Sequence, residues 1–134
     1  ISRSFEIKAF KSGAARMSID AQVPILPVIV WGSQRIATKG GPRNLGRTKT
    51  PVFVAFGDPI PPPPADTVTT DALVGELKRT MQRMLLEVQE RYADQPAGAY
   101  WVPARLGGGA PTLEEADAMD VADAAARAAK RQDG

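Results

Sequence analysis

The chain has 134 residues, 43% of them apolar, with 17 Lys and Arg against 15 Asp and Glu and no Cys or His. This length indicates one domain of modest size. The missing Cys and His exclude a disulfide framework, Cys- or His-ligated zinc and any mechanism that needs an imidazole base within this chain. The longest apolar run, Val23 to Trp31, is far shorter than the roughly 20 residues of a membrane-spanning helix.

Basic and acidic residues are divided unevenly between the two ends of the chain. Residues 1–50 contain nine basic residues against two acidic ones, a net charge of +7. The remainder contains eight against thirteen, a net charge of −5. This division indicates an anionic partner for the first part: a phosphate group, a lipid headgroup or a nucleic acid.

The first elements are expected within residues 12–31. Helical spacing predicts a helix from about Ser12 to Ala21 with one apolar face. The β-branched run Val23 to Trp31 predicts a strand buried on both faces, with its two prolines at the entrance or at a bulge. The residues expected on the apolar face of the helix are Phe10, Ala14, Met17 and Ala21.

The middle of the chain predicts a loop, a short strand and a long helix. Residues 32–50 contain four Gly and five basic residues without an acid, as in a long surface loop. Val52 to Phe56 predicts a second strand, and four prolines at 61–64 predict a stiff spacer. Residues 70–92 have the apolar spacing of an amphipathic helix, from which Leu86 departs, and its Met81, Met84 and Leu85 are expected in the core.

The C-terminal segment is expected to be more loosely ordered. Three glycines at 107–109 predict a flexible break after Tyr100–Pro103. Thr112 followed by Glu115 is a capping-box pattern that opens an Ala-rich helix to about Lys130. Because alanines bury little area, we expect this helix to dock loosely or to fray.

Two short strands cannot complete an α/β domain by themselves. Their ladder edges and apolar faces stay exposed unless further strands cover them. The sequence therefore predicts an α/β fold that is incomplete as given.

A cluster of cations precedes the first predicted helix. Arg3, Lys8 and Lys11 lead into Ser12-Gly13, where free backbone N–H groups and the positive end of the helix dipole favour an anion. Gly13 would let a phosphate group approach the backbone closely. The alternative is that these charges only solvate a surface loop.

Two blocks in this region resemble a known family. Phe10-Lys11-Ser12-Gly13-Ala14-Ala15-Arg16, followed by Val23-Pro24-Ile25-Leu26-Pro27-Val28, resembles the later motifs of lysophospholipid acyltransferases, specifically bacterial 1-acyl-sn-glycerol-3-phosphate acyltransferases. The resemblance extends from residue 1 to about 106. In that family a Phe-Pro-Glu-Gly-Thr-Arg-Ser block comes first. This chain resembles one that begins after its Glu-Gly-Thr, which places the usual Arg at Ile1 and leaves Arg3 as the nearest cation.

The resemblance implies a fold and a division of the chain. The fold would be the C-terminal part of a glycerol-phosphate-acyltransferase-like mixed sheet flanked by helices. Residues 1–60 would belong to the acyltransferase α/β domain, 61–95 would form the proline spacer and the long helix, and 96–134 would form the Gly-rich break and the Ala-rich, loosely ordered tail. The start at Ile1 would then reflect a truncated or processed chain.

The resemblance also implies an activity, acyl transfer from a thioester to 1-acyl-sn-glycerol-3-phosphate in phospholipid biosynthesis. Arg3, Lys11, Ser12 and Gly13 would bind the acceptor phosphate. The family's His-x4-Asp motif is absent, so no catalytic residue is assigned and the chain alone is expected to be inactive. No metal or cofactor is implied, and acyl-CoA or acyl carrier protein would supply the acyl group. The expected location is cytoplasmic, peripheral to the inner face of an anionic plasma membrane.

Two other functions are open from the residues alone. One is a noncatalytic module that binds anionic lipid or phosphate through the basic part of the chain. The other, nucleic-acid binding, is disfavoured because no aromatic residue for base stacking lies between Trp31 and Phe53. Trp31 is expected to pack inside rather than to anchor at a membrane interface. The basic loop residues are expected either against lipid headgroups or simply in solvent: Arg35, Lys39, Arg43, Arg47 and Lys49.

Overall fold

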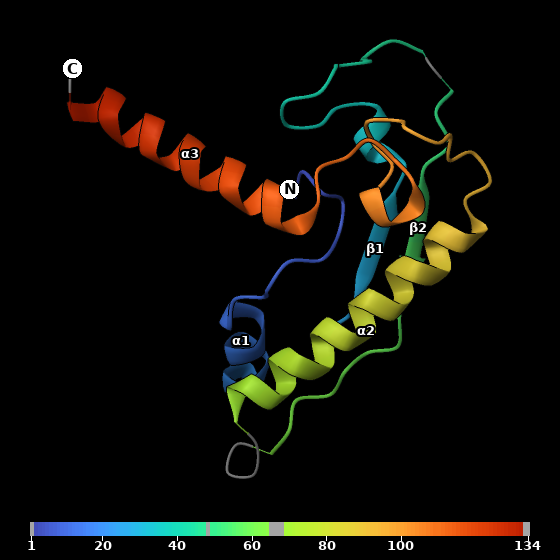
Figure 1. Ribbon diagram of the computed structural model, residues 1–134. Coiled ribbons are helices and arrows are strands. Elements are labelled where there is room, and N and C mark those ends of the chain that lie inside the picture. Colours follow the sequence, from blue (N-terminus) through green and yellow to red (C-terminus); the bar gives the residue numbers. More distant parts are fainter. Residues whose placement is uncertain (1, 48, 65–68, 133–134) are drawn as a thin grey trace. The chain divides into compact units, whose positions relative to one another are not determined.

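The computed structural model describes residues 2–47, 49–64 and 69–132. In these residues it contains three α-helices, two short 3-10 turns and a two-stranded antiparallel sheet (Figure 1). The prediction of a mixed α/β fold is confirmed at this level. The chain divides into a terminal unit, formed by Ile1–Lys8, Ala37–Arg43 and Asp94–Gly134, and a sheet unit, formed by Ala9–Ile36 and Asn44–Ala93.

The first helix of the sheet unit, α1, extends from Gly13 to Ala21 and confirms the predicted helix. Of its predicted apolar face only Phe10 packs against the core; Ala14, Met17 and Ala21 are exposed, whereas Ala15 and Ser18 are buried. The Ser18 hydroxyl donates a hydrogen bond of 2.6 Å to the carbonyl oxygen of Val23. A small residue and a locally satisfied hydroxyl therefore allow close packing that the larger apolar side chain would prevent.

The sheet consists of β1, Val28–Trp31, and β2, Phe53–Phe56. Val28 pairs with Phe56 and Trp31 with Phe53. The strand predicted from Val23 is shorter than expected, because the two prolines lie before it, as predicted, and cannot donate to a ladder. A single bridge between Ile25 and Ile60, with backbone hydrogen bonds of 2.9 and 2.8 Å, continues the pairing beyond Pro27.

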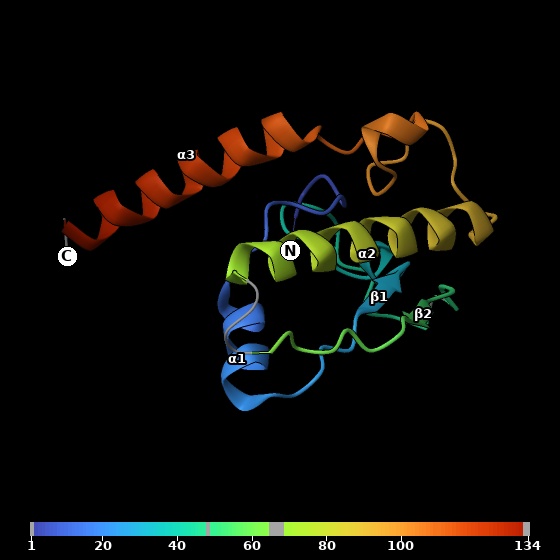
Figure 2. The ribbon, with the colours of Figure 1, turned by 90° about the horizontal axis from the view of Figure 1, so that it is seen from below.

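Only one face of this sheet is covered, so the prediction of a strand buried on both faces is wrong. Helix α2, Thr70–Arg91, packs against β1 and β2 (Figure 2). On the other face Val30 and its partner Val54 are about half exposed, and Phe56 is 69% exposed. No other described strand adjoins β1 or β2. The exposed face agrees with the expectation that two strands alone cannot cover their apolar surface.

Helix α2 supplies most of the core, as its spacing predicts. Its buried side chains recur at intervals of three and four residues and contact α1 and the sheet. Leu86 is exposed, as its departure from the stripe predicts. A cluster at its N-terminal end joins Leu73 and Leu77 to Ala15 and Ile60. Further along α2 the buried residues are Met84, Leu85, Val88 and Gln89.

Tyr92 closes one end of the sheet unit. Its hydroxyl donates to the carbonyl oxygen of Pro51 and accepts from Arg35, both at 2.9 Å. Its ring meets Phe53 edge to face, with centroids 5.4 Å apart. Gly32, with φ of +97°, turns the chain after β1 directly beside this ring. These contacts anchor both ends of the loop that connects the two strands.

The terminal unit contains a compact turn followed by α3, Leu113–Gln132. The glycines at 107–109 lie in this turn, where Gly98 N–H donates to Gly107 and Gly109 N–H donates to Ala99. The predicted capping box is confirmed: Glu115 N–H donates to Thr112 Oγ1 at 3.2 Å, and the Thr112 N–H donates to Glu115 Oε2 at 2.9 Å. Of the described helices, none has the length and apolarity to cross a membrane.

Candidate phosphate-binding site

The start of α1 presents free backbone donors. The first hydrogen bond of this helix runs from the Arg16 N–H to the Ser12 carbonyl oxygen at 2.9 Å, so the preceding N–H groups have no helical acceptor. Ser12 makes no side-chain cap with any residue that the structure describes. A Cβ built on Gly13 meets no atom within 4 Å, so the backbone there is open to a ligand.

Lys11 stands beside these donors. Its side chain is exposed, and it makes no ion pair within the described part of the chain. Three of the four residues predicted to bind phosphate, Lys11, Ser12 and Gly13, therefore lie together at an accessible helix start in the sheet unit. Backbone donors, the helix dipole and an adjacent ammonium are together suited to a phosphate group.

Arg3, the fourth predicted residue, belongs to the terminal unit. Its guanidinium is 2.7 Å from the carboxylate of Asp123, and its side chain is only 11% exposed. An ion pair within the chain therefore already uses this cation. Ile1, the position that corresponds to the family's usual Arg, lies outside the described residues.

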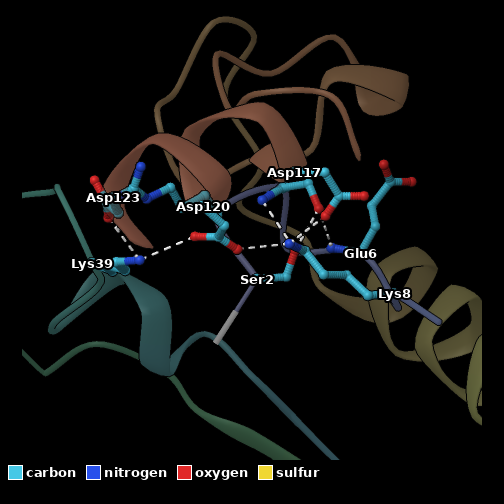
Figure 3. A network of polar contacts seen from close by, with 9 residues as sticks. Ser2, Glu6, Lys8, Lys39, Asp117, Asp120 and Asp123 are labelled. Carbon is cyan, nitrogen blue, oxygen red and sulfur yellow. Dashed lines mark hydrogen bonds and ion pairs between the residues drawn. The ribbon is translucent and has the colours of Figure 1, made fainter. Parts of the chain in front are cut away.

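Arg3 is one member of a larger network on α3 that sequence reasoning missed. Three aspartates of α3 contact three cations from the distant segments 2–8 and 37–43, as Figure 3 shows for the two lysines. The spacing of three residues between successive aspartates was the available signal, because it places them along one side of a helix. The distances are 2.6 and 2.7 Å from Lys8 to Asp117 and Asp120, 3.0 and 2.9 Å from Lys39 to Asp120 and Asp123, and 2.7 Å from Arg3 to Asp123.

These contacts shift the pKa of both partners in the directions that stabilise the ion pairs. Hydrogen bonds from Lys8 and Lys39 hold the pKa of the Asp120 carboxyl well below its usual value of 3.8. A hydrogen bond from Lys39 lowers the pKa of Asp123. Hydrogen bonds to Asp117 and to Asp123 raise the pKa of Lys8 and of Lys39, respectively, above 10.5.

These shifts predict a pH window for the attachment of α3. The lowered pKa values mean that the contribution of Asp120 and Asp123 is present above about pH 4 and declines as acid protonates these two carboxylates. The raised lysine pKa values mean that their contribution is present below 10.5 and is lost at higher pH. Amide-exchange protection of residues 113–123, measured relative to 77–88 of α2, should fall on both sides of this window. Equal relative protection at pH 2 and pH 6 would contradict it.

The basic loop residues divide into engaged and exposed ones. Arg35 binds Tyr92, and Lys39 belongs to the α3 network. Arg43, Arg47 and Lys49 are exposed, whereas Thr48 lies outside the described residues. Of the five basic loop residues, these three are therefore the ones available for contact with lipid headgroups. Trp31 is buried, which confirms the prediction of a packing role.

A groove of about 580 Å³ lies between α2 and the segment that follows β2. Its lining contains none of the residues predicted to bind phosphate. The charged residues along it have both signs, so the groove does not select an anion or a cation: Asp58, Glu76, Arg83, Glu87 and Arg91. No group of acidic side chains suited to a metal ion occurs among the residues that the structure describes.

Comparisons with known proteins add no assignment. No protein-family model, no curated protein and no solved structure matches this chain. The structure itself defines a small mixed fold of three helices and a two-stranded antiparallel sheet in the described residues.

Proposed function

We propose that this chain is the acceptor-binding part of an acyltransferase that moves an acyl group from a thioester to 1-acyl-sn-glycerol-3-phosphate in phospholipid biosynthesis. One observation supports this most: the Phe10–Arg16 block, which resembles an acyltransferase motif, coincides with an accessible helix start and with an exposed lysine that forms no ion pair with any described residue. The Val23–Val28 block follows directly and leads into β1. The fold would then be the C-terminal part of a glycerol-phosphate-acyltransferase-like domain.

The chain's own residues would perform the binding part of the reaction. The N–H groups of the exposed residues Gly13 and Ala14 would donate to the phosphate oxygens, and the Lys11 ammonium would neutralise one charge. Arg3, which the resemblance also assigns to the phosphate, belongs to the terminal unit and is paired with Asp123. Holding the phosphate positions the free hydroxyl of the acceptor, and this positioning supplies proximity rather than proton transfer.

In the family that this chain resembles, a His accepts the proton of the attacking hydroxyl, and this chain contains no His. Acyl-CoA or acyl carrier protein would provide the thioester. As the resemblance implies, the site of action would be cytoplasmic, at the inner face of an anionic membrane, with Arg43, Arg47 and Lys49 toward the headgroups.

Binding of lysophosphatidic acid tests this proposal. We expect the chain to bind lysophosphatidic acid in preference to lysophosphatidylcholine, because only the former presents a phosphate monoester to the helix start. Lys11→Gln should weaken that binding about 5- to 10-fold, the loss of one charge-assisted contact. Isothermal titration calorimetry below the critical micelle concentration measures both affinities, and acyl transfer by the chain alone should be negligible.

Lys78→Gln is the matched control, because it removes the same charge from α2 rather than from the segment that leads into α1. Equal affinity for the two lysolipids, or equal effects of the two substitutions, would contradict the proposed site. Preference for any anionic lipid without discrimination of the monoester would instead favour the noncatalytic lipid-binding module.

A further inference from the structure

We infer that Arg3, Lys8 and Lys39 form a second anion-binding cluster, in the terminal unit, and that α3 masks this cluster with its own aspartates. A phosphate-bearing ligand and α3 would therefore compete for the same three cations. The inference depends on the proposed function only for the chemical class of the ligand, a phosphate monoester.

The first argument is the convergence of charge. Arg3 and Lys8 come from the N-terminal segment and Lys39 from the loop, yet all three contact one helix more than 80 residues further along the chain. Each cation has a carboxylate oxygen within 3.0 Å, and Figure 3 shows Lys8 and Lys39 beside these aspartates. Three cations this close repel one another, so the cluster needs an anion. In this structure the aspartates of α3 provide it.

The second argument is that little else holds α3 in place. Among its described side chains Ala116 is buried, Asp120 and Asp123 are partly buried, and the others are exposed. The helix is rich in alanine, so its packing contributes little apolar burial. Ion pairs at a surface are weak and sensitive to salt. A multivalent anion can therefore replace α3 at a small cost.

The third argument is that the cluster adjoins an open cavity. A space of about 210 Å³ is lined by Arg3, Lys39, Gly40 and Gly41, together with Tyr100 and Met119. Arg3 Nε and Thr38 Oγ1, in two of the lining residues, are buried and have no hydrogen-bond partner among the residues that the structure describes. Buried donors normally have an acceptor. An oxyanion that reached these two atoms would provide one.

The chemistry of the cluster favours phosphate over a single carboxylate. A phosphate monoester has nearly two negative charges at neutral pH and three acceptor oxygens. One guanidinium and two ammonium groups offer matching charge and several donors. A single phosphate monoester can thus take the place of the aspartate carboxylates that now contact these cations.

The test is a variant that unmasks the cluster without touching its cations. The triple variant Asp117→Asn, Asp120→Asn, Asp123→Asn should bind vesicles of phosphatidylcholine with 30 mol% phosphatidic acid at least about tenfold more tightly than the unaltered chain, because each freed cation near an anionic surface strengthens binding about fivefold. Vesicle sedimentation at constant salt measures this. A second arm titrates inorganic phosphate: tighter binding in both arms supports a free phosphate ligand, and tighter binding to vesicles alone supports a lipid headgroup.

The control changes the same net charge elsewhere. Asp20→Asn, Glu76→Gln and Glu90→Gln remove three exposed carboxylates from the sheet unit and should strengthen vesicle binding less than threefold. Adding Arg3→Gln, Lys8→Gln and Lys39→Gln to the unmasked variant should abolish its gain, whereas adding Arg79→Gln, Arg83→Gln and Arg91→Gln, which remove three exposed cations from α2, should leave most of it. A gain as large in the control as in the unmasked variant would overturn the inference.

Amide exchange in the unaltered chain provides a readout that does not depend on a variant folding. Phosphatidic acid vesicles should reduce the protection of residues 113–123 and leave 77–88 of α2 protected. Vesicles that bind while α3 keeps its protection would overturn the masking. A Lys11→Gln substitution in the unmasked variant separates the two proposals. If this variant keeps its stronger binding to vesicles, the masked cluster is supported. If Lys11→Gln also leaves the affinity for lysophosphatidic acid unchanged, the proposed acyltransferase site fails.

Discussion

Replacing Leu85 with alanine should lower the free energy of unfolding by about 2–5 kcal/mol, the usual cost of truncating a buried leucine. Leu85 is 8% exposed on the side of α2 that faces the core. Truncation removes apolar contacts and leaves a cavity that the two-stranded sheet can fill only by moving. Urea denaturation followed by far-ultraviolet circular dichroism measures the effect.

Leu86 provides the matched control, because it is the same residue type in the same helix, one position further on. It is 46% exposed, so Leu86→Ala should change the stability by less than about 1 kcal/mol. Similar losses of unfolding free energy for the two variants would mean that α2 does not bury the face that contains Leu85. Because the residues are adjacent, helix propensity cancels in the comparison.

Gly32→Ala should destabilise the chain by about 2–5 kcal/mol through two effects that add. The residue has a φ of +97°, where a side chain is strained. A Cβ there would also collide with the Pro51 carbonyl oxygen and lie 3.1 Å from the Tyr92 hydroxyl, so that the chain would have to shift or the Tyr92 hydrogen bond to Pro51 would be disturbed. Thermal denaturation measures the total loss.

Gly40→Ala separates the two effects. Gly40 has a similarly positive φ of +77°, but a Cβ built on it meets nothing within 4 Å. This substitution should cost only about 1–2 kcal/mol, the penalty for the left-handed conformation. If the two glycine variants lost equal stability, the close approach of Pro51 and Tyr92 to Gly32 would have no energetic role.

Several features of the structure were predictable because they depend on local geometry. The apolar face of α2 and the exposure of Leu86 follow from the helical period, because this period alone determines which side chains lie on the same side of the helix. Thr112 and Glu115 form their capping box within one turn, and the prolines precede β1 because they lack an N–H. The accessible donors at Gly13 likewise follow from the position of a helix start.

Other features depend on which distant segments meet. The buried face of α1 was mispredicted because Ala15 and Ser18, rather than Met17, lie where space is limited against α2. The predicted burial of β1 on both faces was wrong because a pattern of apolar residues reports what a strand would bury, not whether anything covers it. Among the described elements, only α2 covers β1, and it covers one face.

For the site, the sequence alone determined that no imidazole base is present and that cations precede a helix start. Only the tertiary structure decided that Lys11 has no ion-pair partner among the described residues, while Arg3 and Lys8 bind aspartates more than 100 residues away. The physical reason is range: backbone geometry sets the period and the ends of a helix over a few residues, whereas the partner of a charge depends on the path of the whole chain.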